Sequence, residues 1–446
     1  MSRDHLATSE AVAPSAPDGT AGGDGPSAED VKGTGCRVIA RPRHRRQQFA
    51  ITGLSVVLSL GAAELVVRAV RPQMTLSAAK RYSPGYWRPS DILPAELVAG
   101  YARPTINPET KAVVQLTINS RGLRSPEFAT PKPSGTFRIL VLGDSFAFNT
   151  SMSDEQVYTR ILEDRLNQSS LVAQRRFEVI NCGYADGYSA DSYIAFMQQR
   201  GFGFEPDLVM MQYFVRNDVV DLLETRVTAW RNELPAATQS DYRWVDADGS
   251  LRSRYTDFKY RVPLLRESHF FIGLYNLFRV EGLARRLMSF VVPNYRGHNF
   301  EPNRVGISYQ GIYQDPLPPI VEEAFERSMD LIARFNALCR ARGVSLVVVI
   351  VPTGIQVNRT AWMEKFGQQL RYEEEADQVF PQRRIVARLA AAGMRVFDPL
   401  AEYRQAARLQ PLYLGQDRDG HWTVAGNRVT AQILFRYLTR TGFINA

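Results

Sequence analysis

From Arg138 onward, continuous apolar runs alternate with stretches in which hydrophobic residues recur at helical spacing. A continuous apolar run that ends in a turn is typical of a buried parallel strand, and a 3.6-residue repeat is typical of an amphipathic helix. The pattern predicts strands over 138–143, 177–183, 208–214, 345–352 and 394–400, and helices over 154–168, 189–201, 320–342, 374–392 and 423–439. This alternation indicates a three-layer α/β/α sandwich with a mainly parallel central sheet.

Two stretches depart from the alternation. Residues 222–318 are mixed in character, and we interpret them as a large insertion into one domain over 136–446. Within the insertion, DADGSL (246–251) is typical of a hairpin turn, and Ser268–Met288 has the spacing of an amphipathic helix. Residues 71–135 are rich in Pro and turn residues, which predicts a loosely structured lead-in segment with short strands such as Val113–Ile118.

The N-terminal region differs from the rest of the chain. Residues 1–48 are mostly small, polar and charged and end in a basic cluster; we expect a disordered tail, because such a composition cannot bury enough apolar surface. Residues 49–70 (FAITGLSVVLSLGAAELVVRAV) carry no charge before Glu64, which is spaced to pair with Arg68 on one helix face. Crossing a bilayer needs about 20 apolar residues, so this stretch fits a single transmembrane helix.

The basic cluster before this segment favours a cytoplasmic N-terminus by the positive-inside rule. We therefore expect a single-pass anchor in the cell membrane, with everything after Val70 on the periplasmic or extracellular side. Two other interpretations remain open. The segment could be a signal peptide cleaved near the small residues 61–63, or a buried amphipathic helix.

The composition of the chain excludes several classes of protein. Hydrophobic residues make up 45% and charged residues 22% of the chain, which excludes a wholly disordered chain, a collagen and a multi-span membrane protein. The 3 Cys have neither metal-ligand spacing nor the number for a disulfide scaffold. The formal net charge of +8 is mild for 446 residues and forms no dense basic stripe, so we expect no nucleic-acid partner.

Two polar motifs stand at predicted strand ends, where open α/β sheets place their ligand sites. Gly143-Asp144-Ser145 follows the first strand, and free backbone N–H groups at the start of the next helix favour a developing oxyanion. Asn217 follows the third strand, and its amide can donate a hydrogen bond to the same oxyanion. Taken alone, each motif is more often a turn or a helix cap.

A third motif, Asp419-Gly-His421, precedes the last predicted helix. A carboxylate beside an imidazole fixes its tautomer and stabilises the imidazolium that forms when the ring takes a proton. The chain has 5 His, and only His421 lies in the framework of the predicted sheet with a carboxylate beside it.

In this order, Ser, Asn and the Asp/His pair resemble the SGNH, or GDSL-type, hydrolase family, over about 115–220 and 320–440. The segment TINSRGLRSPEF before the first strand is similar to bacterial membrane-anchored members of that family. The resemblance implies that Ser145 is the nucleophile and that Asp419 and His421 form the catalytic pair. It also implies an oxyanion hole made by the backbone N–H groups of Ser145 and Gly187 and the side chain of Asn217. It implies no metal and no organic cofactor.

Two positions depart from the family's pattern. Val215 stands where the third block has Gly, and Arg418 stands where the usual Asp-x-x-His block has Asp. Asp-x-His followed by Trp422 resembles the alginate-type O-acetyltransferase branch, which favours Asp419 as the partner of His421. Asp417 remains the alternative.

Three functions follow from these residues. The first is a membrane-anchored esterase that hydrolyses small-molecule or carbohydrate acyl esters through a covalent seryl ester. The second is an O-acyltransferase that uses the same site to modify a cell-surface polysaccharide. The third is a non-catalytic binding or scaffold protein, against which the joint presence of Ser, Asn, Asp and His argues. The sequence does not separate the first two.

Overall fold

The computed structural model describes residues 43–73, 75–78, 85–107, 112–172, 175–184, 187–253, 263, 265–279, 309–358, 379–414 and 420–444. The chain divides into two compact units, residues 1–59 and residues 60–446. The expected disordered tail lies outside the described residues up to position 42.

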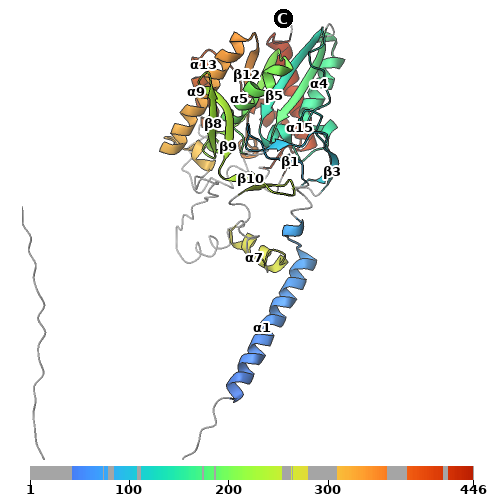
Figure 1. Cartoon of the computed structure of the whole chain (residues 1–446), viewed down its shortest axis with the longest axis vertical. Coiled ribbons are helices and arrows are strands. Elements are labelled where there is room, and N and C mark those ends of the chain that lie inside the picture. Colours follow the sequence, from blue (N-terminus) through green and yellow to red (C-terminus); the bar gives the residue numbers. More distant parts are fainter. Residues whose placement is uncertain are drawn as a thin grey trace, which may run out of the picture. The chain divides into compact units, whose positions relative to one another are not determined.

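A five-stranded parallel sheet forms the centre of the second unit (Figure 1). Its strand order is β13-β12-β7-β5-β6. The bounds are β5 (Thr136–Gly143), β6 (Arg176–Gly183), β7 (Leu208–Phe214), β12 (Ser345–Val351) and β13 (Arg395–Phe397). Every neighbouring pair is parallel, which confirms the predicted α/β fold class.

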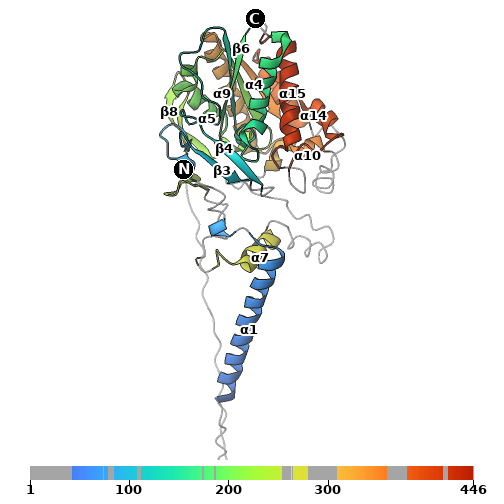
Figure 2. The ribbon, with the colours of Figure 1, turned by 90° about the vertical axis from the view of Figure 1, so that its right-hand side faces the viewer.

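Helices cover both faces of the sheet (Figure 2). Alternate residues of β5 divide between two apolar cores, as the two-residue period of a strand requires. Leu140 and Leu142 belong to the core under α5 (Ala190–Gln199), α9 (Pro319–Ala341) and α13 (Phe380–Ala391). Ile139 and Val141 belong to the core under α4 (Tyr158–Gln168), α14 (Leu400–Ala407) and α15 (Val424–Arg440). The sheet is therefore the middle layer of three.

The strand order contains a topological switch point beside β5. From β5 the chain moves to β6 on one side and then returns to β7 on the other. In open α/β sheets, ligands bind at the carboxyl ends of the strands where this reversal occurs. A ligand site is therefore expected at the residues that directly follow β5, β6 and β7.

The insertion contains more regular structure than the sequence predicts. Strands β8 (Thr225–Arg231) and β9 (Leu234–Ser240) form an antiparallel hairpin, and β9 packs against α5. The expected turn at 246–251 is confirmed, because it joins β10 (Arg243–Val245) to β11 (Leu251–Ser253). A helix, α7 (His269–Arg279), occupies the first half of the stretch predicted to be helical. The second half lies outside the described residues.

The lead-in segment forms two small antiparallel pairs. Strand β1 (Trp87–Arg88) pairs with β2 (Glu96–Leu97), and β3 (Ala102–Ile106) pairs with β4 (Val113–Thr117). The predicted short strand at Val113–Ile118 is thus present as β4.

Helix α1 (Arg43–Val70) precedes the domain, and 24 of its residues, Gln47–Val70, are apolar enough and long enough to cross a bilayer. No side chain of this apolar stretch is buried inside the protein. A signal sequence can have the same length and composition. Such an exposed helix is unlike the core helix of a soluble domain, which buries at least one face.

Candidate active site

Ser145 is the first residue of the short helix α3 (Ser145–Phe148), directly beyond the end of β5. Asp144 caps this helix, because its Oδ1 accepts a hydrogen bond of 2.9 Å from the backbone N–H of Phe146. The neighbouring strand ends at Gly183, where a Cβ would overlap Ala147. The missing side chain allows α3 to lie close against the sheet, and Ser145 remains partly accessible to solvent while Asp144 is buried.

Two of the expected oxyanion donors converge on one oxygen atom. The backbone N–H of Gly187 donates to Oδ2 of Asp221 at 2.9 Å, and Nδ2 of Asn217 donates to the same Oδ2 at 2.6 Å. Nδ2 of Asn217 also donates to Oδ2 of Asp144 at 3.2 Å. Gly187 has a φ of 85°, a left-handed conformation that favours glycine. The loops after β5, β6 and β7 thus meet at one point.

Asp221 lies on the short helix α6 (Asp218–Asp221), which follows β7. Its side chain is completely buried. A carboxylate oxygen and the oxyanion of a tetrahedral intermediate accept similar hydrogen bonds, so these two donors are arranged to bind an anionic oxygen. An ester carbonyl can use these two donors only if it replaces Oδ2 of Asp221.

Three carboxyl groups are buried within this small volume. Burial raises the pKa of Asp144 to about 6, against the lowering effect of its hydrogen bonds from Phe146 and Asn217 and of the nearby His421. Burial likewise raises the pKa of Asp218 well above its ordinary value, and the charges of Asp144 and Asp221 raise it further. The neutral forms of Asp144 and Asp218 are therefore favoured, which limits the negative charge in this volume.

Arg243 and Glu224 are a buried pair that the sequence reasoning missed. The guanidinium of Arg243, on β10, packs so closely on the Cα of Gly187 that a Cβ there would overlap it. Its Nη2 lies 3.8 Å from Oε2 of Glu224, and both side chains are almost fully buried. The insertion therefore places a positive charge directly beside the Gly187 donor, and no local motif around Arg243 signals this in the sequence.

His421 lies beside the Ser145 helix, with its ring 5.1 Å from the ring of Phe146, the residue after the serine. The next residue, Trp422, is fully buried and packs at 4.9 Å on the same Phe146 ring. Both candidates for the carboxylate of the catalytic pair, Asp417 and Asp419, lie outside the described residues. The structure thus brings His421 to the same sheet edge as Ser145, although 276 positions separate them in the sequence (421 − 145).

Asn427 of α15 connects this C-terminal segment to the loop after α3 through hydrogen bonds. Its Oδ1 accepts hydrogen bonds from Nδ2 of Asn149 at 2.8 Å and from the backbone N–H of Tyr158 at 3.1 Å. Asn427 is completely buried, so these bonds are shielded from water. The last helix consequently helps to fix the position of the segment that carries Ser145.

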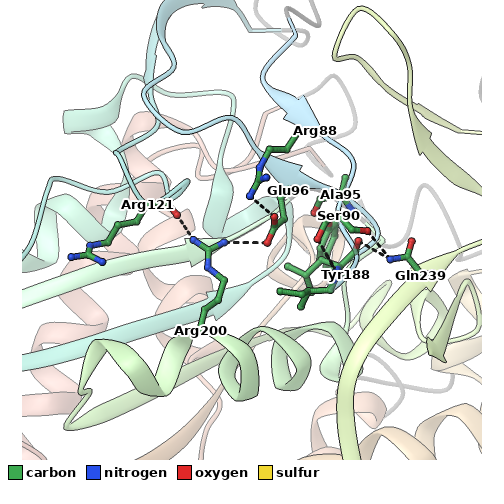
Figure 3. A network of polar contacts seen from close by, with 10 residues as sticks. Arg88, Ser90, Ala95, Glu96, Arg121, Tyr188, Arg200 and Gln239 are labelled. Atoms are coloured by element: carbon green, nitrogen blue, oxygen red, sulfur yellow. Dashed lines mark hydrogen bonds and ion pairs between the residues drawn. The ribbon is translucent and has the colours of Figure 1, made fainter. Parts of the chain in front are cut away.

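Tyr188, the residue after Gly187, connects the loop that carries Gly187 to the lead-in segment (Figure 3). Its hydroxyl accepts a hydrogen bond of 2.8 Å from the backbone N–H of Ala95 and donates a short one to the Ala95 carbonyl. Next to it, Glu96 bridges Arg88 at 2.6 Å and Arg200 at 3.1 Å. The lead-in segment therefore supports the loop that carries Gly187.

Among the described residues, no group of three or more His, Cys, Asp and Glu side chains is arranged to hold a metal ion. The two described cysteines, Cys182 and Cys339, are buried, and burial raises the pKa of each thiol. A buried thiol with a raised pKa is a poor nucleophile. Ser145 is accordingly the candidate nucleophile at this sheet edge.

A family model matches residues 315–446, and its description is SGNH hydrolase-like domain, acetyltransferase AlgX. The match includes His421 and the last helix but not Ser145, Gly187 or Asn217. No curated protein sequence matches the chain.

Several solved structures match over about two thirds of the chain. LAE5, an α/β hydrolase from the metagenome of Lake Arreo in Spain, is 14% identical, with 70% of this chain and 97% of LAE5 covered and a TM-score of 0.33. Axe2, an acetylxylan esterase from Geobacillus stearothermophilus, is 12% identical, with 67% of this chain and 93% of Axe2 covered and a TM-score of 0.33.

Proposed function

We propose that this chain, whose residues 315–446 match an SGNH hydrolase-like family model, is an acyl-transfer enzyme that forms a covalent seryl ester at Ser145. The observation that carries this proposal is the convergence of the Gly187 N–H and the Asn217 amide on one anionic oxygen beside the Ser145 helix. Preorganised donors that meet at a single oxygen are what the tetrahedral intermediate of acyl transfer requires.

In the first half of the reaction, the Ser145 hydroxyl oxygen attacks the carbonyl carbon of an ester. His421 accepts the proton of the hydroxyl, and the carbonyl oxygen becomes the oxyanion. When the intermediate collapses, the bond to the alcohol breaks and His421 returns the proton to the leaving oxygen. The product is an acyl group esterified to Ser145 and a free alcohol.

The carbonyl oxygen of the substrate takes the place of Oδ2 of Asp221 between the two donors. Asp221 then turns away, and the guanidinium of Arg243, which packs on Gly187 and pairs with Glu224, keeps a positive charge close to this loop. Each correctly placed oxyanion donor contributes about 3 kcal/mol to the stabilisation of the transition state. The displacement of Asp221 is therefore a binding cost that the two donors must outweigh.

Asp419 orients the imidazole of His421 in this proposal, with Asp417 as the alternative. In serine proteases, an Asp that fixes the tautomer of the catalytic His contributes about 10⁴-fold in rate, so the two candidates are separable by kinetics. Asp419→Asn should reduce kcat by orders of magnitude, whereas Asp417→Asn should reduce it less than about tenfold. If the Asp417 variant is the more impaired of the two, Asp417 is the partner of His421.

The acceptor in the second half of the reaction distinguishes two enzymes. Water as the acceptor makes the protein an esterase. A sugar hydroxyl as the acceptor makes it a polysaccharide O-acetyltransferase, and the match to the AlgX family favours this second candidate. In both cases the substrate is an acyl ester, and one of the reactants is a small molecule or a carbohydrate.

We also propose that α1 anchors the protein in the cell membrane, with the domain on the periplasmic or extracellular side. The supporting observations are the length and exposure of Gln47–Val70 and the basic residues that precede it. Substrates on the cell surface would then be within reach of the tethered site.

The test of the chemistry compares Ser145→Ala with Ser169→Ala in the full-length protein. Ser169 lies at the end of α4, away from the proposed site, and serves as the matched control. A fluorophosphonate probe should label the native protein and the Ser169 variant but not the Ser145 variant. Labelling that persists without Ser145 would place the nucleophile elsewhere.

The test of the acceptor measures p-nitrophenyl acetate turnover with and without an oligosaccharide. An esterase releases acetate at the same rate in both conditions. An O-acetyltransferase releases p-nitrophenol faster when the oligosaccharide is present and leaves acetyl groups on the sugar, which mass spectrometry detects.

A further inference from the structure

The carboxylate of Glu64, in the second half of α1, binds the N-terminus of helix α7. It accepts hydrogen bonds from Ser268 Oγ at 2.8 Å, from the backbone N–H of His269 at 2.9 Å and from that of Phe270 at 2.8 Å. The first N–H groups of a helix lack partners within the helix, and a negative charge is favoured there. The spacing of the sequence pairs Glu64 with Arg68, whereas in the structure the carboxylate caps α7.

Further contacts hold α7 along the end of α1. The backbone N–H of Gln73 donates to Nδ1 of His269 at 2.8 Å, and the backbone N–H of Leu76 donates to the carbonyl of Arg266 at 3.1 Å. A Cβ at Gly273 would lie 3.5 Å from the side chain of Val67, at ordinary contact distance, so this position of α7 faces α1. Helix α7 is therefore docked on α1 between Glu64 and Gln73.

This docking fixes the depth of α7 relative to the apolar helix. Glu64 lies inside the apolar stretch Gln47–Val70, six residues before its end (70 − 64). At about 1.5 Å of rise per residue, it lies roughly 9 Å along the axis from Val70. A carboxylate at this depth in a bilayer is costly unless it is paired or hydrogen-bonded, and the N-terminus of α7 supplies the hydrogen bonds.

Helix α7 carries apolar side chains that remain partly exposed. Phe270 and Phe271 are half-buried, and Leu274 is 40% exposed. Ile272, in contrast, is completely buried. A helix whose apolar face sinks about 5–10 Å into the boundary of headgroups and acyl chains has the depth at which Glu64 holds α7.

We propose that α7 is a second membrane contact, which lies in the headgroup region of the bilayer that α1 crosses and places Phe270, Phe271 and Leu274 against lipid. The occupant is lipid, because α7 docks at the end of an apolar helix whose residues 47–62 are all exposed. The inference rests on the proposed membrane anchor and goes beyond the proposed acyl transfer. It assigns Glu64 the role of fixing the depth and direction of α7.

The test uses the full-length protein in vesicles of phosphatidylethanolamine and phosphatidylglycerol. Cys36, Cys182 and Cys339 are replaced by Ala, and retained labelling by a fluorophosphonate confirms that this background folds. Leu274→Cys then carries an environment-sensitive fluorophore. The matched control is Leu409→Cys, because Leu409 is an 87% exposed leucine after α14. Quenching is measured with aqueous iodide and with lipids that carry a nitroxide near the headgroup.

The fluorophore at position 274 should be quenched by the nitroxide lipid and shielded from iodide, with the reverse at position 409. Adding Glu64→Ala should shift the label at 274 towards iodide accessibility while the protein still resists extraction by carbonate. Equal iodide quenching at 274 and 409 in a carbonate-resistant protein overturns the inference but leaves the anchor intact. A shielded label that nitroxide lipids do not quench also overturns it and indicates a second copy of the chain as the occupant. Extraction by carbonate shows that the proposed anchor itself has failed.

Discussion

Asp221 occupies the position between the Gly187 and Asn217 donors that the proposed mechanism assigns to the substrate oxyanion. We predict that Asp221→Asn increases the rate of fluorophosphonate labelling and kcat/KM for an ester at neutral pH. A hydrogen bond to a charged acceptor is stronger than one to a neutral acceptor by about 1 kcal/mol, so a neutral side chain should compete less with the substrate. The expected gain is roughly fivefold.

Asp191→Asn is the control for this experiment. Asp191 is also completely buried, but its hydrogen bonds come from Thr225 and Ser192 rather than from the oxyanion donors. Its replacement should not accelerate labelling. A large loss of activity in Asp221→Asn would mean instead that the carboxylate is needed to hold the two donors in place.

Asp144 should make the stability of the protein depend on pH. Its pKa is raised by burial from 3.8 to about 6. Between these values, the folded state keeps a proton that the unfolded state has released, so the free energy of unfolding falls as the pH rises through this window. Asp144→Asn removes this titration and should make the fall shallower between about pH 4 and pH 6. Urea midpoints followed by tryptophan fluorescence measure it; an unchanged slope would contradict the raised pKa.

The residues of the proposed site differ in how clearly the sequence predicts them. Ser145 and Asn217 follow continuous apolar strands, and the topology of a parallel sheet brings such positions to one edge. Asp221 and Arg243 have no comparable signal. Asp221 is a polar residue in a one-turn helix, and Arg243 reaches Gly187 only because the insertion folds back over the loop. Contacts made by tertiary structure leave no periodic pattern along the chain.

At the scale of elements, the loop that carries Gly187 depends on its attachment to the lead-in segment. We predict that Tyr188→Phe destabilises the protein by about 1–3 kcal/mol, because the backbone N–H and carbonyl of Ala95 lose their buried partner. The ester turnover should fall as well, since the adjacent Gly187 is no longer held. Urea unfolding and ester assays on the same preparation measure both effects.

Tyr184→Phe is a closely matched control for this prediction. The rings of Tyr184 and Tyr188 stack at 5.0 Å, and both are almost completely buried. The hydroxyl of Tyr184 is buried without a hydrogen-bond partner among the described residues, so its removal should be neutral or slightly stabilising. Equal losses in the two variants would indicate a packing effect of the ring pair rather than the bond to Ala95.

The elements of the sheet could be predicted from the sequence, whereas the β8–β9 hairpin could not. Strands β5, β6, β7 and β12 are continuous apolar runs, because both faces of each strand are buried. Most residues of β8 are exposed or half-exposed, so no apolar alternation marks it. Its turn, Asn232-Glu233, has positive φ at both residues but lacks the Gly that signals such a turn.

At the scale of the whole molecule, the proposed anchor makes a prediction about sidedness. Protease added to spheroplasts should cut the domain after Val70 and spare the tail before α1, because the bilayer separates them. The measurement is an immunoblot with one tag at each end of the chain. A full-length protein found wholly in the soluble cytosolic fraction would contradict the anchor, and a protein released without the segment before residue 64 would indicate a cleaved signal peptide.

The hydrogen bonds of Asn427 to Asn149 and Tyr158 have a consequence for the order of assembly. A chain that emerges N-terminus first exposes Ser145 long before His421 and α15 have left the ribosome or crossed the membrane. During that interval the serine lacks the proposed proton acceptor, and the loop behind it lacks the helix that fixes it. In the proposed mechanism the site is therefore incomplete until α15 docks on the loop after α3. The proposed acyl transfer should then begin only after α15 has folded onto the domain.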